Sequence, residues 1–460
     1  MAITFDVLDP ATGRLIEKVV DGSEREAVIA VDAAYSAFPA WSATPSRQRA
    51  EILRRCYDLM LRDAETLAKL IAAENGKSVS DAKAEVLYAA EFFRWFSEEA
   101  VRGDGSYGNA PLGAAKTLVT KAPVGVAALV TPWNFPAAMG TRKIAPALAA
   151  GCTVVLKPAE ETPLTALALE ELFTEAGVPE GVINVVPTTN AAGVVSTWLQ
   201  DDRVRKLSFT GSTQVGRVLL AQAADRVVNC SMELGGNAPF IVTADADLDE
   251  AIKGAMIAKF RGGGQACTAA NRFYVHQTVL DEFTKKLCDA VDALRVGPSS
   301  DPLNEIGPVI NLKSRDRIAQ LVEGALLNGA RIATKCKIPE GGYFYPPTVL
   351  ADVPMDAQIL SEEIFGPVAP IVAWTDETAM LAAANNTEFG LAAYVYSGRM
   401  QDALRIGEKI EAGMVGINRG IVSDPSAPFG GVKQSGIGRE GANEGIREFQ
   451  ETRMYSIDWK

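Results

Sequence analysis

Hydrophobic and polar residues alternate with two different periods along this chain. Residues 3–20 alternate with a period of two around the sequence DPATG, and this pattern predicts a hairpin at an edge of the fold. From Ser46 onward apolar residues recur at helical spacing, and Asn75 with Gly76 predicts the end of that helical stretch. A second helix is expected from about residue 80 to residue 101. These helices should cover one face of a sheet.

Beyond Lys116, strand patterns and helical patterns follow one another in turn. This order is typical of βαβ units with a mostly parallel sheet. After Gly236 a second set of the same kind begins and continues to about Gly413, so a second domain is expected. The expected strands are GVAALV, TVVLKPA, VINVVP, a strand ending at Phe209, APFIVTA and residues 272–275; the expected helices are Pro136 to Ala150, Thr162 to Ala176, one beginning near Ser212, and about Leu248 to Phe260.

The composition indicates a large globular protein. With 460 residues, of which 48% are apolar, the chain is long enough for about three domains. The 45 Lys and Arg residues against 57 Asp and Glu residues leave a net charge of −12. This charge argues against nonspecific attraction to nucleic acid or to an anionic membrane. An anionic substrate would therefore need a local basic site.

The sequence predicts no secretion signal, membrane segment or metal site. The N-terminal residues lack a basic stretch followed by an apolar one, so the protein is expected in the cytoplasm. The most apolar long region, residues 124–156, is interrupted by prolines and by the charged residues Arg142 and Lys143. The six cysteines lie far apart without a C-x-x-C pair, and we interpret them as reduced thiols.

One of these cysteines stands in the glycine-rich stretch FRGGGQACTAANR. Gly262, Gly263 and Gly264 permit backbone conformations with positive φ, and they precede Cys267, which is flanked by small residues. The pattern indicates a thiol that is presented to a ligand. The alternative is a tight turn followed by a buried thiol, because free cysteine is among the most buried residue types. This stretch alone leaves both possibilities open.

A second stretch, MELGGNAP, supplies a carboxylate. Glu233 closes an apolar strand pattern and is followed by two glycines, which predicts a carboxylate that faces a cleft at a strand end. The single histidine, His276, lies in an alternating segment that predicts a strand, and we interpret it as structural. A hydrolase with a Cys/His pair therefore has little support.

With Asn134 of TPWNFP and the block PFGGVKQSGIGREG, these motifs resemble the aldehyde dehydrogenase superfamily over nearly the whole chain. The resemblance implies an α/β fold with a Rossmann-type cofactor domain, an α/β catalytic domain and a small oligomerisation sheet, in a homodimer or homotetramer. The expected ranges are 1–104 and 124–235 for the cofactor domain, 236–435 for the catalytic domain, and 105–123 with 436–460 for oligomerisation.

Members of that family oxidise an aldehyde to a carboxylate with NAD or NADP. The resemblance makes Cys267 the nucleophile, and the side-chain amide of Asn134 with the backbone N–H of Cys267 would bind the oxyanion. Glu233 would activate the water that hydrolyses the thioester, or take the thiol proton first. Lys143 and Glu440 match a pair that passes protons outward in relatives; an ordinary solvated pair is the alternative.

The cofactor positions also follow from matched motifs. Glu160 would accept hydrogen bonds from the adenosine ribose, whereas a 2′-phosphate would bring like charge against it, so NAD is expected to be preferred and NADP to remain possible. By itself, the pair Gly211 and Gly216 is weak support for a dinucleotide site. Without the motifs, Ser212 would be a helix N-cap and Glu363 a surface carboxylate. The residues that match cofactor contacts are Trp133, Lys157, Pro158, Ala159, Glu160, Gly211, Ser212, Leu234, Glu363 and Phe365.

Arg142, Arg261 and Ser423 match the three positions that bind the distal carboxylate in family members that act on succinic semialdehyde. Two guanidinium groups would give an acidic protein the local site that such an anion needs. The alternative for Arg142 is a charge on a helix surface, for Arg261 a salt-bridge partner, and for Ser423 a hydroxyl group in a loop. Glutaric semialdehyde and an uncharged aliphatic or aromatic aldehyde are the alternative substrates. The chain departs from the family at Gly262, where close relatives carry Asn, and at Ala269, where some carry a second cysteine.

Overall fold

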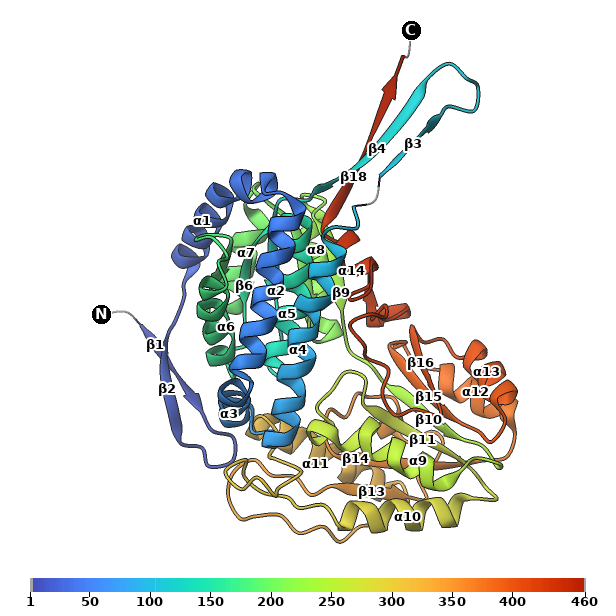
Figure 1. Ribbon diagram of the computed structural model, residues 1–460. Coiled ribbons are helices and arrows are strands. Elements are labelled where there is room, and N and C mark those ends of the chain that lie inside the picture. The colour runs from blue at the N-terminus through green and yellow to red at the C-terminus, as the bar shows by residue number, and fades with distance from the viewer. Residues whose placement is uncertain (1–2, 104, 459–460) are drawn as a thin grey trace.

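Two large β-sheets organise the computed structural model, which describes residues 3–103 and 105–458 (Figure 1). The first sheet consists of β5 (Val126–Val130), β6 (Thr153–Lys157), β7 (Ile183–Val185), β8 (Val204–Thr210), β9 (Asn229–Glu233) and β17 (Gly436–Ile437). Their order is β17-β9-β8-β5-β6-β7, and neighbours are parallel except for β17 with β9. The chain passes from β5 to β6 on one side and returns to β8 on the other, so β5 lies beside a topological switch point.

Helices cover both faces of this sheet, because alternate residues of each strand face opposite sides. Ala127 and Leu129 of β5 pack against one set of helices, and Val126 and Ala128 pack against the other. The first set is α2 (Ser46–Arg62), α3 (Ala64–Asn75), α4 (Val79–Glu99), α5 (Pro136–Ala150) and α6 (Pro163–Glu175); the second is α1 (Glu24–Ala43), α7 (Ala191–Gln200) and α8 (Thr213–Ala224).

The N-terminal predictions are mostly confirmed. Strands β1 (Thr4–Leu8) and β2 (Leu15–Val20) form an antiparallel hairpin, and Gly76 ends α3 with a φ of 86°. The helical stretch expected from Ser46 is interrupted at Asp63, whose ψ of 13° ends α2 and whose carboxylate accepts a hydrogen bond from Arg62 Nε at 2.8 Å. Helices α1 and α7 were not predicted.

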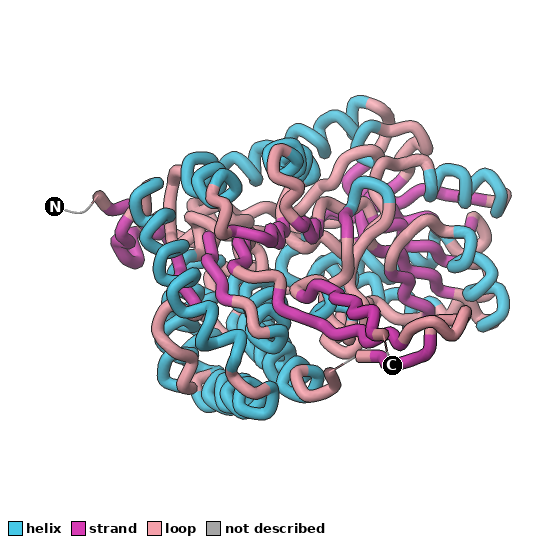
Figure 2. The backbone as a smooth tube through the Cα atoms, turned by 90° about the horizontal axis from the view of Figure 1, so that it is seen from above, coloured by secondary structure: helices cyan, strands magenta, loops and turns pink. Residues whose placement is uncertain are grey.

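The second sheet has seven strands in the order β12-β13-β14-β11-β10-β15-β16, and only β12 is antiparallel to its neighbour. Its strands are β10 (Ala238–Val242), β11 (Ala270–His276), β12 (Arg331–Ile332), β13 (Thr348–Ala351), β14 (Val368–Trp374), β15 (Ala392–Tyr396) and β16 (Met414–Ile417). Figure 2 shows from above that helices lie outside the strands of both sheets.

The helices of this second half are α9 (Leu248–Ala255), α10 (Leu280–Asp292), α11 (Leu312–Leu327), α12 (Glu377–Asn385), α13 (Met400–Lys409) and α14 (Glu444–Arg447), with short turns η3 (Gln358–Leu360) and η4 (Lys433–Ser435). The helix expected to reach Phe260 is α-helical only to Ala255. It continues as a π-helical turn, η1 (Met256–Phe260), and a tight turn, η2 (Arg261–Gly264). His276 ends β11 with its ring edge-on to Trp374, which suits a structural role.

A third, antiparallel sheet projects from the body of the molecule (Figure 1). It contains β3 (Ser106–Asn109), β4 (Lys116–Pro123) and β18 (Gln450–Ile457) in the order β18-β4-β3. Tyr107, Met454 and Tyr455 are exposed on it. The expected domain and oligomerisation ranges remain predictions, and the parts of them at residues 1–2, 104 and 459–460 lie outside the described chain.

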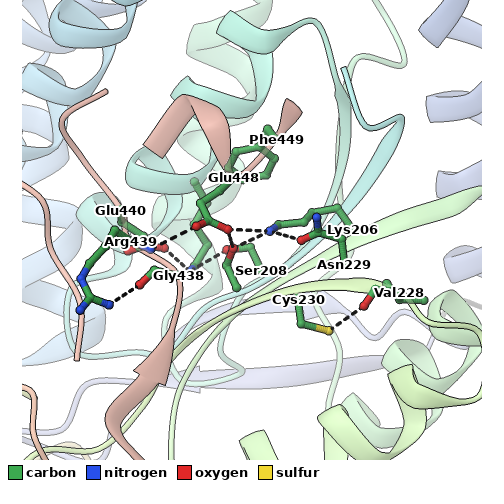
Figure 3. Close-up of polar contacts among 12 residues, drawn as sticks. Lys206, Ser208, Val228, Asn229, Cys230, Gly438, Arg439, Glu440, Glu448 and Phe449 are labelled. Atoms are coloured by element: carbon green, nitrogen blue, oxygen red, sulfur yellow. Dashed lines mark hydrogen bonds and ion pairs between the residues drawn. The ribbon is translucent and has the colours of Figure 1, made fainter. Parts of the chain in front are cut away.

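The C-terminal segment returns from the second sheet to the first and is fixed there by a buried ion cluster (Figure 3). Lys206 of β8 is fully buried and donates to Asn229 Oδ1 at 2.7 Å and to Glu448 Oε2 at 3.2 Å. Ser231 of β9 donates to the same Glu448 oxygen at 2.6 Å. Lys206, Asn229 and Ser231, from the neighbouring strands β8 and β9, therefore anchor Glu448 and the residues that lead into β18.

In residues 3–103 and 105–458, no helix is both long enough and apolar enough to cross a membrane. The same described part contains no cluster of three or more His, Cys, Asp or Glu side chains suited to a metal ion.

Candidate active site

A cavity of about 440 Å³ lies at the carboxyl ends of β5, β8 and β9, where they meet loops of the second half of the chain. In open α/β sheets, ligands bind at this edge beside the switch point. Eleven of the residues predicted for the site line this one cavity: Trp133, Asn134, Arg142, Gly211, Ser212, Leu234, Arg261, Cys267, Glu363, Phe365 and Ser423. The fold therefore brings together groups from six separate stretches of sequence.

The three glycines before Cys267 form the tight turn that presents it. Gly262, Gly263 and Gly264 have φ values of 59°, 64° and 72°, a region that only glycine adopts readily. A Cβ on Gly264 would lie 2.3 Å from the carbonyl oxygen of Gly366, so this position also needs the missing side chain. Cys267 is partly exposed and lines the cavity, which favours a thiol that is presented to a ligand over one that only packs in the core.

Burial controls the protonation of the thiol and of the neighbouring carboxylate. It raises the pKa of Cys267 to about 12, and the negative charge of Glu363 adds to this shift. Glu233, at the end of β9, is buried, and burial together with the charge of Glu440 raises its pKa well above the usual value. Glu233 Oε2 has no hydrogen-bond partner within the described residues. The raised pKa makes Glu233 a stronger base than an ordinary carboxylate. The thiol of Cys267, which must lose a proton to react, is close enough to feel its charge.

Asn134 follows β5 and is buried beside the cysteine loop. Its Nδ2 donates to the carbonyl oxygen of Gln265 at 3.0 Å, which fixes the side-chain amide relative to Cys267. An amide nitrogen carries two hydrogens, so one donor is left for a ligand.

Lys143 and Glu440 form a buried ion pair, with Lys143 Nζ 2.5 Å from Glu440 Oε1 and 3.0 Å from Ser208 Oγ. The alternative of an ordinary solvated pair is wrong, because Lys143 is 1% and Glu440 is 6% exposed. Every residue of α5 is buried, since this helix packs between the sheet and the other helices on that face. For the same reason, Arg142 is not a helix-surface charge.

Arg142 is fixed on three sides at the wall of the cavity. Its Nε lies 3.5 Å from Glu440 Oε2, its Nη2 donates to the hydroxyl of Tyr88, and its Cζ lies 3.9 Å from the ring centre of Phe429. Nη1 donates no hydrogen bond to the described residues, which leaves its N–H groups for a ligand. Arg261 lies over the ring of Phe135 at 5.7 Å and makes no ion pair in the described chain, so the salt-bridge alternative is wrong.

Tyr88 and Phe429 are cavity residues that the sequence did not reveal. Their role depends on contact with Arg142, and no local pattern or motif signals that contact.

The part of the cavity that is lined by Ser212, Trp133 and Phe365 suits a dinucleotide. Ser212 caps α8, and its Oγ accepts from the backbone N–H of Val215 at 3.3 Å, so the N-cap alternative is correct and compatible with ligand binding. The first turn of α8 contains no acidic residue, and a helix N-terminus of this kind favours phosphate. Trp133 and Phe365 pack edge-to-face with ring centres 5.4 Å apart beside it.

The other predicted cofactor residues, Lys157, Pro158, Ala159 and Glu160, stand at and just after the end of the adjacent strand β6 and do not line the cavity itself. Lys157 is buried, and burial lowers its pKa while the carboxylates of Glu160 and Glu161 oppose the shift. Glu160 is exposed to solvent at this edge, so its carboxylate can accept hydrogen bonds from the hydroxyl groups of a ligand.

Fold and cavity are those of an NAD(P)-dependent aldehyde dehydrogenase. The aldehyde dehydrogenase family profile matches residues 2–455, and the chain belongs to that family. It is similar to the crystal structure of succinate-semialdehyde dehydrogenase from Burkholderia pseudomallei, with a TM-score of 0.97 and 45% identity over 99% of this chain and 95% of that one. The predicted family and fold class are thereby confirmed.

Among curated proteins, the chain is 52% identical to a succinate-semialdehyde dehydrogenase from Paenarthrobacter nicotinovorans, over 96% of this chain and 99% of that protein. It is 49% identical to the NADP(+) succinate-semialdehyde dehydrogenase of Escherichia coli K12, over 98% and 94%. It is 47% identical to a glutarate-semialdehyde dehydrogenase of Pseudomonas putida KT2440, over 99% and 94%.

Proposed function

We propose that this protein oxidises succinic semialdehyde to succinate. The observation that supports the proposal most directly is the buried guanidinium of Arg142, which lines the same cavity as Cys267 and whose Nη1 has no hydrogen-bond partner among the described residues. Arg261 and Ser423 line that cavity too and would complete a site for a carboxylate. The names of the relatives from Paenarthrobacter and Escherichia agree with this substrate. Glutaric semialdehyde is the second candidate, favoured by the Pseudomonas relative.

In the proposed reaction, Cys267 loses its proton to Glu233 and attacks the aldehyde carbon. The second hydrogen of Asn134 Nδ2 and the backbone N–H of Cys267 stabilise the resulting oxyanion. Bound NAD(P)+ would accept the hydride that converts the adduct into a thioester. Glu233 then activates the water that hydrolyses the thioester, and the buried pair of Lys143 and Glu440 lies on the route by which its proton leaves.

We propose NAD as the preferred cofactor. The exposed carboxylate of Glu160 next to Lys157 supports this preference, because a carboxylate binds ribose hydroxyls and repels a 2′-phosphate. The Escherichia relative carries NADP(+) in its name, so the preference is not a property of the whole group. The expected location in the cytoplasm stays a prediction.

The projecting sheet supports a homo-oligomer, because the strand at each edge leaves unpaired backbone groups. Sedimentation should give a multiple of the chain mass, and Tyr455→Asp on exposed β18 should shift it toward the single chain. Leu327→Asp, at a more exposed site on α11, is the control and should leave the mass unchanged. Wild-type protein that sediments as a single chain would contradict the oligomer.

Cys267→Ala should abolish NADH formation from any aldehyde while the circular dichroism spectrum stays that of the wild type. Glu233→Gln should slow turnover by about 10²-fold or more, the usual effect of losing a general base. Cys336→Ala, which removes a partly buried thiol outside the cavity, should retain full activity. A near wild-type rate with Cys267→Ala would refute the nucleophile.

The cofactor preference is tested by kcat/KM for NAD and for NADP at fixed aldehyde. Wild type should favour NAD, and Glu160→Ser should move the ratio toward NADP by about tenfold, because one like charge is removed. Glu171→Ser changes an exposed carboxylate on α6 and should leave the ratio unaltered. A wild-type enzyme that favours NADP would overturn this assignment.

The substrate is tested with succinic semialdehyde, glutaric semialdehyde, butanal and benzaldehyde. Arg142→Ala and Arg261→Ala should each lower kcat/KM for the two charged substrates by about ten- to a hundredfold, because each removes a charge-assisted hydrogen bond. Both variants should affect butanal less, although Arg142→Ala should still slow it, because Arg142 also favours the thiolate of Cys267. Equal wild-type kcat/KM for butanal and succinic semialdehyde, or equal losses for charged and uncharged substrates, would show that the carboxylate site is wrongly assigned.

A further inference from the structure

A buried lysine lies behind the cysteine loop and has no part in the proposed reaction. Lys259 is 1% exposed and belongs to the π-helical turn η1. It makes no ion pair in the described chain, and its Nζ donates to Asn271 Oδ1 at 3.3 Å. Burial lowers the pKa of Lys259 to about 7, against the opposing effect of Glu363. Burying an ammonium group costs free energy, so we expect Lys259 to stabilise the groups around it.

Asn271, the partner of Lys259, contacts the backbone on both sides of Glu363. Its Nδ2 donates to the carbonyl oxygen of Glu362 at 2.8 Å, and its Oδ1 accepts from the N–H of Ile364 at 3.4 Å. The same Nδ2 donates to Asn237 Oδ1 at 2.8 Å. Asn271 therefore connects the start of β11 to the loop that carries Glu363, and Lys259 orients its amide oxygen.

The side chain of Glu363 reaches the cavity from this loop. Its Oε1 accepts from the N–H of Gly236 at 3.0 Å, and its backbone oxygen accepts from Arg317 Nη1 at 2.8 Å. Burial raises the pKa of Glu363 to about 7, whereas the charges of Arg317 and Lys259 favour the ionised form. An ionised carboxylate accepts two hydroxyl donors, whereas the protonated acid must use one oxygen as a donor.

We propose that Lys259 and Asn271 are positioning residues that hold Glu363 in place for the hydroxyl groups of the nicotinamide ribose. This inference rests on the cofactor site of the proposed function. Asn271 fixes the backbone around Glu363, and Lys259 fixes the amide of Asn271 through its hydrogen bond to Oδ1. Neither residue touches the cofactor, so both act through Glu363.

A double-mutant cycle tests this dependence by calorimetric titration of NAD into the full-length protein without aldehyde. Lys259→Met should weaken NAD binding about tenfold, because Asn271 loses the donor that orients its amide and the loop of Glu363 is held less firmly. Glu363→Gln should weaken binding similarly, and the double variant should bind as weakly as Glu363→Gln alone. Additive losses, or unaltered binding by Lys259→Met, would overturn the proposal.

Two further variants separate this role from a general effect on folding. Lys253→Met removes an exposed lysine on α9 and should leave NAD affinity unchanged. Asn271→Ser keeps Lys259 but shortens the amide, and should also weaken NAD binding only when Glu363 is present; it serves if Lys259→Met melts below the assay temperature. If wild type binds no NAD, the cofactor site itself is wrong. If Glu363→Gln weakens binding while the Lys259 and Asn271 variants do not, only this inference fails.

Discussion

The ion pair between Lys143 and Glu440 is the interaction on which the arrangement of the site depends. It joins α5, which follows the first strand of one sheet, to the segment that returns from the other sheet. Both side chains are buried, and removing one partner of such a pair typically costs about 3 to 5 kcal/mol. Lys143 of α5 would therefore be buried without a partner if the C-terminal segment did not return to this sheet. The same segment contains β17, which pairs with β9 at Glu233 itself, so the contact also fixes the carboxylate beside the thiol.

The electrostatics of the cavity follow from burial. It favours the neutral forms of both Cys267 and Glu233, and it raises the pKa of each. A carboxylate with a raised pKa is a stronger base, which suits a group that must take a proton from a thiol or from water. Arg142 acts in the opposite direction and lowers the pKa of Cys267, so one guanidinium serves both the thiolate and, as proposed, the far end of the substrate. The cost of burying Arg142 is offset by Glu440, Tyr88 and the ring of Phe429.

Much of the fold was predictable because its elements have strong local patterns. Helix α5 has the predicted bounds, since Pro136 at its first turn and Gly151 after its last residue are local signals. The interruption at Asp63 was missed because the apolar spacing continues across it. The π-helical turn before Phe260 was missed as well, because the sequence there fits an α-helix. Of the site, the motif residues were predictable, whereas Tyr88, Phe429 and the buried state of Lys143 were not.

The sequence by itself determined which residue types were available and where elements with strong local signals, such as α5, begin and end, because caps, glycines and periodic apolar positions act within a few residues. It also determined the family, through several motifs in one order. Only the tertiary structure decided the surroundings of each charged residue: Arg142 and Lys143 are buried and paired, Arg261 lacks an ion pair in the described chain, and Lys259 contacts Asn271. Burial and partner choice depend on contacts between segments far apart in the chain, and these contacts exist only after both sheets have come together.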